Sequence, residues 1–243
     1  VTGVQTCALP ILLADLESLE KRVVNLEKRA KTGDKESALT LKLVQLALAE
    51  LNAGRPARKA VVSKEDEKAW RMLQLLTSKP ALYVSNVDEA SAATGNELSA
   101  QVAERAKRDG ADHVVISAQI ESEVAMLEPA ERDELLETLG LAEPGLNKLI
   151  REAYHLLGLQ TYFTVGPKEA RAWTIHKGDT APQAAGVIHT DFEKGFIRAE
   201  TIAYEDYVRL KGEAGARKAG KFRQEGKEYV VQDGDVMNFR FNV

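Results

Sequence analysis

The sequence has a single cysteine in 243 residues, and that residue, Cys7, lies near the start of the chain. One cysteine can form neither an internal disulfide nor the thiolate pair of a zinc site, which suits a protein of the reducing cytoplasm. The chain also lacks any uninterrupted apolar run of the ~20 residues that a membrane helix needs. We therefore expect a cytoplasmic protein that has no membrane partner.

Residues 1–11 show neither the periodicity of a helix nor the alternation of a strand. They include no initiating methionine, and they lack the basic start of a signal peptide. A DNA string that resembles the end of a sequencing adapter encodes these eleven residues. We therefore expect 1–11, with Cys7, to be a non-native segment and leave it out of the fold prediction.

From residue 12, apolar residues recur at spacings of four and three, with charged residues between them: Leu12, Leu16, Leu19, Val23 and Leu26. This spacing is typical of a coiled-coil seam. Gly33 interrupts the helix, a second apolar helix runs to Leu51, and a third is expected over 63–76. Helices joined by a short turn fold back antiparallel. Residues 12–79 are therefore either a projecting coiled-coil arm or an ordinary hairpin that covers a core.

Two short apolar runs, 81–86 and 113–118, are typical of buried parallel strands. A helix that begins after Asn96 and ends at Gly110 separates them, which predicts a βαβ unit. Two more helices are expected at 129–139 and 146–157. From residue 159, strands over TYFTV, ARAWTI, FIRAETI, EYVV and VMNFRFN, with a helix near 204–210, indicate a small α+β domain. The predicted domains are 12–79, 80–158 and 159–243.

Polar residues follow both βαβ strands: Asn86, Val87 and Glu89 after the first, and Ser117, Ala118 and Gln119 at the end of the second. Ligands of α/β sheets bind beyond the carboxyl ends of the strands. The spacing matches the base-reading pair of P-loop GTPase-like domains, in which N-K-x-D follows one strand and S-A-K the next. The alternative, a strand that simply runs into a turn, stays open on these residues alone.

Two replacements within that pattern bear on the choice of base. Val87 stands in place of the lysine, and Glu89 in place of the aspartate that accepts hydrogen bonds from guanine. A carboxylate that is one methylene longer no longer meets guanine's two donors. A site that loses this match loses most of its preference for guanine. The pattern therefore favours ATP over GTP.

Longer segments resemble one family: Asn86-Val-Asp-Glu89, Ser117-Ala-Gln-Ile-Glu121, the run TYFTVGPKEARAWTIHKGDTAPQAAGVIHTDFEKGFIRAE (161–200) and the ending EGKEYVVQDGDVMNFRFNV (225–243). They look like the YchF family, the Obg-like ATPases, and the likeness covers 12–243. It implies an α/β plus α+β fold. Residues 80–158 would be the C-terminal part of a P-loop nucleotide-binding domain with an inserted antiparallel helical coiled-coil arm (12–79), followed by a ubiquitin-like β-grasp TGS domain (159–243).

The same resemblance implies an activity and partners. It implies that ATP is bound and hydrolysed in preference to GTP, with Mg²⁺ as cofactor. It also implies association with the ribosome, through the large subunit or the 70S particle, with rRNA as a further contact. We expect no DNA partner.

The phosphate-binding motif G-x-x-x-x-G-K-[ST] does not occur. The two Gly-Lys pairs, 220–221 and 226–227, continue with Phe and Glu. Without that loop's backbone cradle, lysine and hydroxyl, the phosphates and Mg²⁺ have no site. We therefore expect a truncated fragment that lacks its catalytic half, holds no catalytic or metal-ligating residue and is inactive alone. The Mg²⁺ ligands would lie in the absent half.

A basic segment near the end of the chain is a candidate contact for RNA or the ribosome: Arg209, Lys211, Arg217, Lys218, Lys221 and Arg223. Each cation that meets a phosphate adds salt dependence to binding. The alternative is a solvated basic loop. The corresponding second function is a nucleotide-independent ribosome- or RNA-binding module. We expect the rings of Tyr162, Phe163 and Trp173 to be core residues, and the four histidines to have structural roles.

Overall fold

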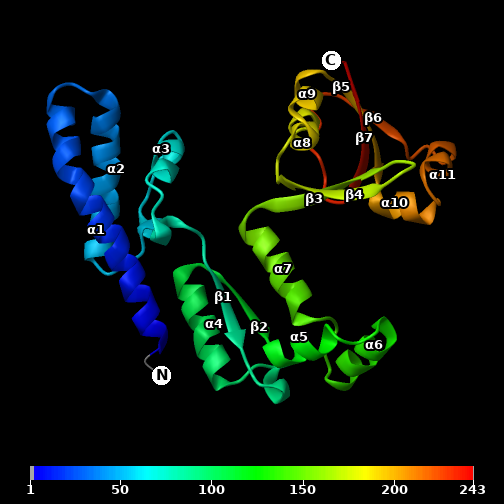
Figure 1. Cartoon of the computed structure of the whole chain (residues 1–243), viewed down its shortest axis with the longest axis horizontal. Helices are drawn as coiled ribbons and strands as arrows, with labels where there is room; N and C mark the ends of the chain where they lie inside the picture. Colours follow the sequence, from blue (N-terminus) through cyan, green and yellow to red (C-terminus); the bar gives the residue numbers. More distant parts are fainter. Residues whose placement is uncertain (1–2, 243) are drawn as a thin grey trace. The chain divides into compact units, whose positions relative to one another are not determined.

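The computed structural model describes residues 3–242, with side chains described from residue 9 (Figure 1). It divides into two compact units, one up to Ala81 and one from Leu82. No helix in the described range is both long and apolar enough to cross a membrane.

An antiparallel hairpin of α1 (Gly3–Lys31) and α2 (Lys35–Asn52) dominates the first unit (Figure 1). Gly33 makes the turn at a φ of 89°, which favours glycine. Asp34 caps α2 by accepting hydrogen bonds from the backbone N–H groups of Glu36 and Ser37 at 3.1 and 3.3 Å. The predicted seam packs here, because its residues surround a buried core of Leu19, Leu43, Val44, Ala47, Leu51, Ala57, Leu73 and Leu75.

Helix α1 begins earlier than the sequence predicts, at Gly3 rather than near Leu12, and it contains Pro10. Leu9 and Ile11 are exposed, so this first part of the helix has no described buried face. A helix already nucleated by packing extends by one hydrogen bond per residue, which needs no apolar periodicity. The periodicity test therefore missed it.

The third predicted helix is shorter than expected. It spans α3 (Glu67–Met72) instead of 63–76, although Ser63 Oγ does accept a hydrogen bond from the Asp66 N–H at 3.3 Å. The chain then leaves the helix at Gln74, whose φ is 56°, and forms the 3-10 turn η2 (Leu76–Ser78). A second 3-10 turn, η1 (Ala57–Lys59), precedes α3.

The buried carboxylate of Asp15 on α1 explains this early end. It accepts hydrogen bonds from the N–H groups of Leu76 and Thr77 at 2.9 and 2.7 Å, and from Thr77 Oγ1 at 2.7 Å. Thr77 Oγ1 in turn accepts from the Ala57 N–H at 3.0 Å. A continued helix would use those backbone donors internally, so the contact with Asp15 competes with the helix and prevails.

The second unit starts with the predicted βαβ arrangement: β1 (Leu82–Asn86), the 3-10 turn η3 (Glu89–Ser91), α4 (Glu97–Asp109) and β2 (Asp112–Ile116). The two strands pair in parallel, with Asn86 opposite Ile116. Asn96 caps α4, and Gly110 ends it at a φ of 67°, as the sequence predicts. Within the described residues this sheet has two strands.

Three helices follow: α5 (Ala118–Val124), α6 (Pro129–Thr138) and α7 (Gly145–Leu156). Ile120, Val124 and Leu136 form a small core between α5 and α6. Gly140 and Gly158 follow α6 and α7 with φ values of 67° and 63°. Both helices therefore end near the glycines where the sequence predicts an end.

The remaining strands form one five-stranded sheet in the order β4-β3-β7-β5-β6. They are β3 (Leu159–Val165), β4 (Ala170–His176), β5 (Phe196–Ala203), β6 (Arg223–Glu225) and β7 (Asp235–Phe241). β3 and β7 are parallel, and the other pairs are antiparallel. The helices of this region are α8 (Ala181–Ile188), α9 (Thr190–Lys194), α10 (Tyr204–Arg209) and α11 (Glu213–Lys218).

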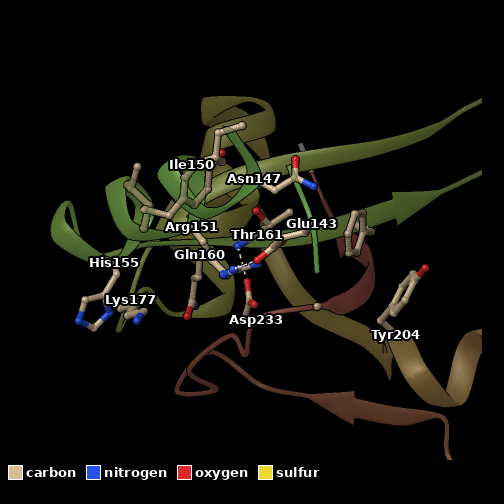
Figure 2. A pocket seen from close by; sticks show the side chains of 14 residues that line it. Glu143, Asn147, Ile150, Arg151, His155, Gln160, Thr161, Lys177, Tyr204 and Asp233 are labelled. Carbon is tan, nitrogen blue, oxygen red and sulfur yellow. Dashed lines mark hydrogen bonds and ion pairs between the residues drawn. The ribbon is translucent and has the colours of Figure 1, made fainter. Parts of the chain in front are cut away.

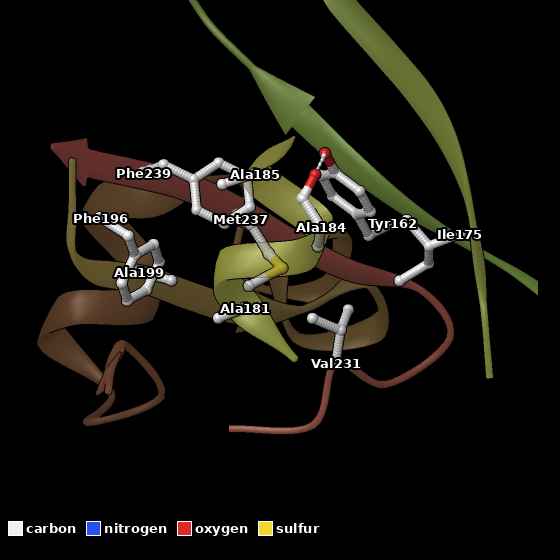
Figure 3. Close-up of a cluster of buried hydrophobic side chains, with 10 residues drawn as sticks. All are labelled: Tyr162, Ile175, Ala181, Ala184, Ala185, Phe196, Ala199, Val231, Met237 and Phe239. Atoms are coloured by element: carbon white, nitrogen blue, oxygen red, sulfur yellow. Dashed lines mark hydrogen bonds between the residues drawn. The ribbon is translucent and has the colours of Figure 1, made fainter. Parts of the chain in front are cut away.

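Figure 3 shows the core of this region, in which α8 packs on the sheet. Tyr162 is fully buried there and donates a hydrogen bond to the Ala184 carbonyl at 2.8 Å. Trp173 packs against this core while its Nε1–H donates to Thr164 Oγ1 at 2.9 Å and Arg171 covers its ring. The expected core role is therefore confirmed for Tyr162 and Trp173. Phe163 instead packs against the ring of Tyr204.

Two sequence expectations for this region were wrong. EYVV is no strand, because in this segment only Val230 forms a bridge, with Thr180, and the neighbouring backbone groups bond to the loop before α8. The strand in this part of the chain is β6 instead. Helices α8, α9 and α11 were not predicted, since each is short and α8 contains both Pro182 and Gly186.

Candidate functional site

The carboxyl ends of β1 and β2 meet at one corner of the small sheet, which we call the base corner (residues 86–89 and 117–119). Asn86 Oδ1 accepts a hydrogen bond from the Ala118 N–H at 2.9 Å, and the Val87 N–H donates to the Ile116 carbonyl at 2.9 Å. These two bonds hold the two segments side by side. The sequence spacing predicted this juxtaposition.

The two carboxylates that follow β1 have different roles. Asp88 caps the turn η3 by accepting a hydrogen bond from the Ser91 N–H at 2.9 Å. Glu89 is exposed, as is Gln119 across the corner, and no hydrogen bond joins these two among the residues described. Val87 is half-buried. Asp88 is exposed as well, but Glu89 is the carboxylate at this corner that does not cap the turn.

Ser117 is the least ordinary residue of the base corner. Its side chain is 3% exposed, and its Oγ has no hydrogen-bond partner within the described part of the chain. Buried polar groups are nearly always paired, and one left unpaired costs about 1–3 kcal/mol. Thr201 Oγ1 on β5 is the other described hydroxyl in this state, and Ser117 differs from it in lying at a strand end, where ligands of α/β sheets bind. The residues present therefore fit a nucleotide base.

Glu121 supports the corner from behind, a role that the sequence analysis did not assign. Its carboxylate accepts hydrogen bonds from the backbone N–H groups of Gly145 and Leu146 at 2.6 and 3.1 Å, and so holds the start of α7. A Cβ on Gly145 would lie 2.9 Å from Glu121 Oε1 and 3.0 Å from Ile116 Cγ2. Only glycine lets α7 approach β2 this closely. The five-residue motif that begins at Ser117 contains Glu121, and that motif was the available signal.

Side chains on β1 and β2 complete the local electrostatics. Ser85 Oγ and His113 Nε2 lie 2.8 Å apart, and burial, with the nearby charge of Lys148, lowers the pKa of His113. Tyr83 donates a hydrogen bond to Asp109 at 2.6 Å, and burial followed by that bond raises the pKa of the phenol. Both groups are neutral at physiological pH, so they brace the sheet and add no charge to the corner.

A cavity of about 830 Å³ lies between α7 and the five-stranded sheet (Figure 2). His155 and Lys177 lie at one end of it and Tyr204 at the other. Near its middle Asp233 accepts a hydrogen bond from the Thr161 N–H at 2.8 Å, and Arg151 pairs with Glu143. No hydroxyl among the described lining residues is hydrogen-bonded to a histidine or a carboxylate.

The predicted basic segment is largely neutralised by its neighbours. Arg209 and Lys221 pair with Asp206, Arg217 with Glu213, and Arg223 with Asp235 and Glu225. Lys211 and Lys218 have no ion pair within the described residues. Of the six cations that the sequence singled out, these two are the ones left for a phosphate.

No group of three or more potential ligands able to hold a metal ion occurs among the described residues. The residues described here therefore do not fit a Mg²⁺ site. They do fit the base of a nucleotide, at the base corner.

Residues 159–242 match the family model YchF-GTPase_C, which carries the description "Protein of unknown function (DUF933)". Over 245 residues the chain is 49% identical to the ribosome-binding ATPase YchF of Bacillus subtilis, covering 100% of this chain and 67% of that protein. It is 51% identical over 233 residues to the protein of the same name from Escherichia coli O157:H7, covering 96% and 64%.

The structure of the Schizosaccharomyces pombe YchF GTPase superposes with a TM-score of 0.83 at 32% identity, covering 98% of this chain and 65% of that one. The chain thus spans about two thirds of the length of these relatives and corresponds to their C-terminal part. The sequence identity and the shared fold show that the chain belongs to the YchF family.

Proposed function

We propose that residues 80–158 form the base-reading half of the nucleotide site of a ribosome-associated ATPase. The observation that carries this proposal is the unpartnered, buried Oγ of Ser117 beside the Asn86–Ala118 hydrogen bond. A buried hydroxyl without a partner is costly to the free protein, and a bound base relieves that cost.

Adenine suits this corner better than guanine. The preference of a base site is set by the buried polar groups that a wrong base leaves unpaired. Glu89 is exposed and one methylene longer than aspartate, and Asp88 is held by its own turn. Neither carboxylate is placed for the paired donors of guanine, whereas adenine lacks those donors.

Hydrolysis would require a phosphate-binding loop, and the 243 residues contain none. We assign that loop, and the Mg²⁺ that acts with it, to sequence outside these residues, so this chain alone is inactive. The α1–α2 hairpin is then the coiled-coil arm and the five-stranded sheet the β-grasp TGS domain. A cytoplasmic location belongs to the same proposal.

Nucleotide titration followed by NMR chemical shifts tests this proposal. We expect ATP and adenosine to bind with similar, millimolar affinity, because no phosphate loop distinguishes them, and GTP to bind more weakly. The variant S117A should weaken adenosine binding about fivefold to tenfold, equivalent to about 1–1.4 kcal/mol, without destabilising the fold. The variant S122A removes an exposed hydroxyl from α5, the helix that Ser117 precedes, and is the matched control.

Two results would count against the proposal. One is ATP binding much more tightly than adenosine, which would require a phosphate site in this chain. The other is S122A weakening adenosine binding as much as S117A, which would show that the base corner is not where the ligand sits.

The second candidate is a ribosome-binding module, since the relatives in B. subtilis and E. coli are named ribosome-binding. Lys211 and Lys218, the unpaired cations of the basic segment, are the proposed phosphate contacts. The double variant K211N/K218Q should reduce co-sedimentation with ribosomes severalfold and lower the slope of log affinity against log salt by about 1–2. Asparagine tolerates the positive φ of 56° at position 211.

The matched control is K107Q/K168Q, which removes two exposed lysines from other elements. If the unchanged chain, K211N/K218Q and K107Q/K168Q all sediment equally with ribosomes, the basic segment is excluded as the ribosome contact. That result would leave the nucleotide proposal intact.

A further inference from the structure

A groove of about 890 Å³ runs between α5 and α6, away from the residues of the base corner. Its lining comes from both helices and from the turn between them: Ser122, Glu123, Met126, Leu127, Glu131, Glu134, Leu135 and Thr138. The opposite side of α5 faces the small core through Ile120 and Val124. The groove is therefore the outward face of a folded helix pair.

The groove is apolar at its centre. Met126 is 87% exposed, Leu127 is 36% exposed, and Leu135 lies half-buried beside them. A methionine side chain is flexible and polarisable, and it adapts to apolar partners of different shape. A large apolar side chain that is this exposed does not contribute to the stability of the fold.

The charges around this centre are all of one sign. Glu123, Glu131 and Glu134 line the groove with no cation, and no ion pair to any of the three is found in the range described. Over 118–142 the sequence has seven carboxylates and one cation, Arg132, which pairs with Asp133 at 3.2 Å. Other exposed carboxylates, such as Glu67 and Glu213, do have arginine partners. The groove thus keeps an uncompensated negative potential.

We propose that this groove binds a Lys- and Arg-rich polypeptide segment that inserts one or two apolar side chains against Met126. Charge complementarity selects such a partner and speeds its arrival, while the apolar centre supplies contact area that charge alone would not. The same carboxylates repel phosphates, so RNA is excluded from this face. The partner is a protein, and its binding is independent of nucleotide.

The test uses the full chain and a synthetic amphipathic helix of leucine and lysine, labelled for fluorescence anisotropy. The variant E123K/E134K should lower the affinity at least tenfold, and M126N should lower it about fivefold. A peptide of equal charge with leucine replaced by serine should bind at least fivefold more weakly than the parent. Glu131 is left unchanged because its carboxylate accepts a hydrogen bond from the Glu128 N–H.

The matched charge control is E27K/E65K, two exposed glutamates of the first unit, and it should bind the peptide as the parent does. Circular dichroism confirms that each variant is folded. Equal weakening by the control, equal binding of the serine peptide, or no binding at millimolar peptide would each overturn the proposal. Self-association of the chain that E123K/E134K abolishes would overturn it too, because the groove would then hold a second copy.

Discussion

Replacing Asp15 by alanine is expected to lower the free energy of unfolding of the first unit by about 3–5 kcal/mol. The buried carboxylate accepts three hydrogen bonds, from the N–H groups of Leu76 and Thr77 and from the Thr77 hydroxyl. Each buried donor left without an acceptor costs about 1–3 kcal/mol. That loss is a large part of the stability of a small unit.

Urea unfolding followed by hydrogen exchange measures this effect in each unit separately. We expect early exchange over η2 and the α1–α2 hairpin and unchanged exchange in the five-stranded sheet. D15N keeps one acceptor and should lose less than D15A. E20A removes an exposed carboxylate from the same helix and should change the unfolding free energy by less than about 0.5 kcal/mol. A D15A protein as stable as E20A would show that the contact contributes nothing.

Asp235 has the corresponding role in the five-stranded sheet, and D235A is expected to cost about 2–4 kcal/mol there. The buried carboxylate accepts hydrogen bonds from the Tyr229 hydroxyl at 2.7 Å, the Gln232 N–H at 3.0 Å and Arg223 at 3.1 Å. Without it the loop before β7 loses these contacts and keeps the two hydrogen bonds that join Asp233 and Gly234 to Thr161 of β3. Y229F, which keeps Arg223 on Asp235, should cost only about 1 kcal/mol.

The titration of Tyr229 gives a second measurement of the same contact. Burial, then the hydrogen bond to Asp235 and the charge of that residue, raise the pKa of Tyr229 above its usual 10.0. The folded state therefore holds the phenol proton more tightly than the unfolded chain does. The resulting stability is complete below pH 10.0 and is lost as pH rises above it.

In D235N we expect the Tyr229 phenolate to form at lower pH, as measured by ultraviolet absorbance, and the alkaline loss of stability to become smaller. E228Q, an exposed neighbour, is the control. A Tyr229 titration that is identical in D235N and in the parent would show that the two groups do not interact.

Local patterns predicted the parts of the fold that local interactions determine. The parallel pairing of β1 with β2, the cap at Asn96 and the end of α4 at Gly110 depend on residues close together in sequence. The juxtaposition of Asn86 with Ala118 followed from the same unit, because one helix connects its two strands. For the base corner, the sequence was therefore enough to place the backbone.

Long-range contacts explain what the sequence did not predict. Asp15 lies 61 residues before the N–H group of Leu76 that it binds, so no local pattern marks the early end of α3. EYVV alternates like a strand, but the Tyr229 carbonyl accepts from the Ala181 N–H and the Val231 N–H donates to Asp179. The unpaired hydroxyl of Ser117 and the ion pairs Lys221–Asp206 and Arg223–Asp235 also depend on tertiary packing. Arg217–Glu213, by contrast, is a local pair four residues apart.

Helix α7 connects the base corner of the second unit to its five-stranded sheet. Its first residue, Gly145, is held by Glu121 behind the base corner, and Gly158, two residues beyond its last turn, leads directly into β3. Twelve residues without an internal proline or glycine make a stiff rod of about 18 Å at ~1.5 Å per residue. A tilt of roughly 5° at one end of such a lever moves the other end by about 1.6 Å. A movement of Glu121 on α5 would therefore be passed along α7 to β3, an interior strand of the five-stranded sheet.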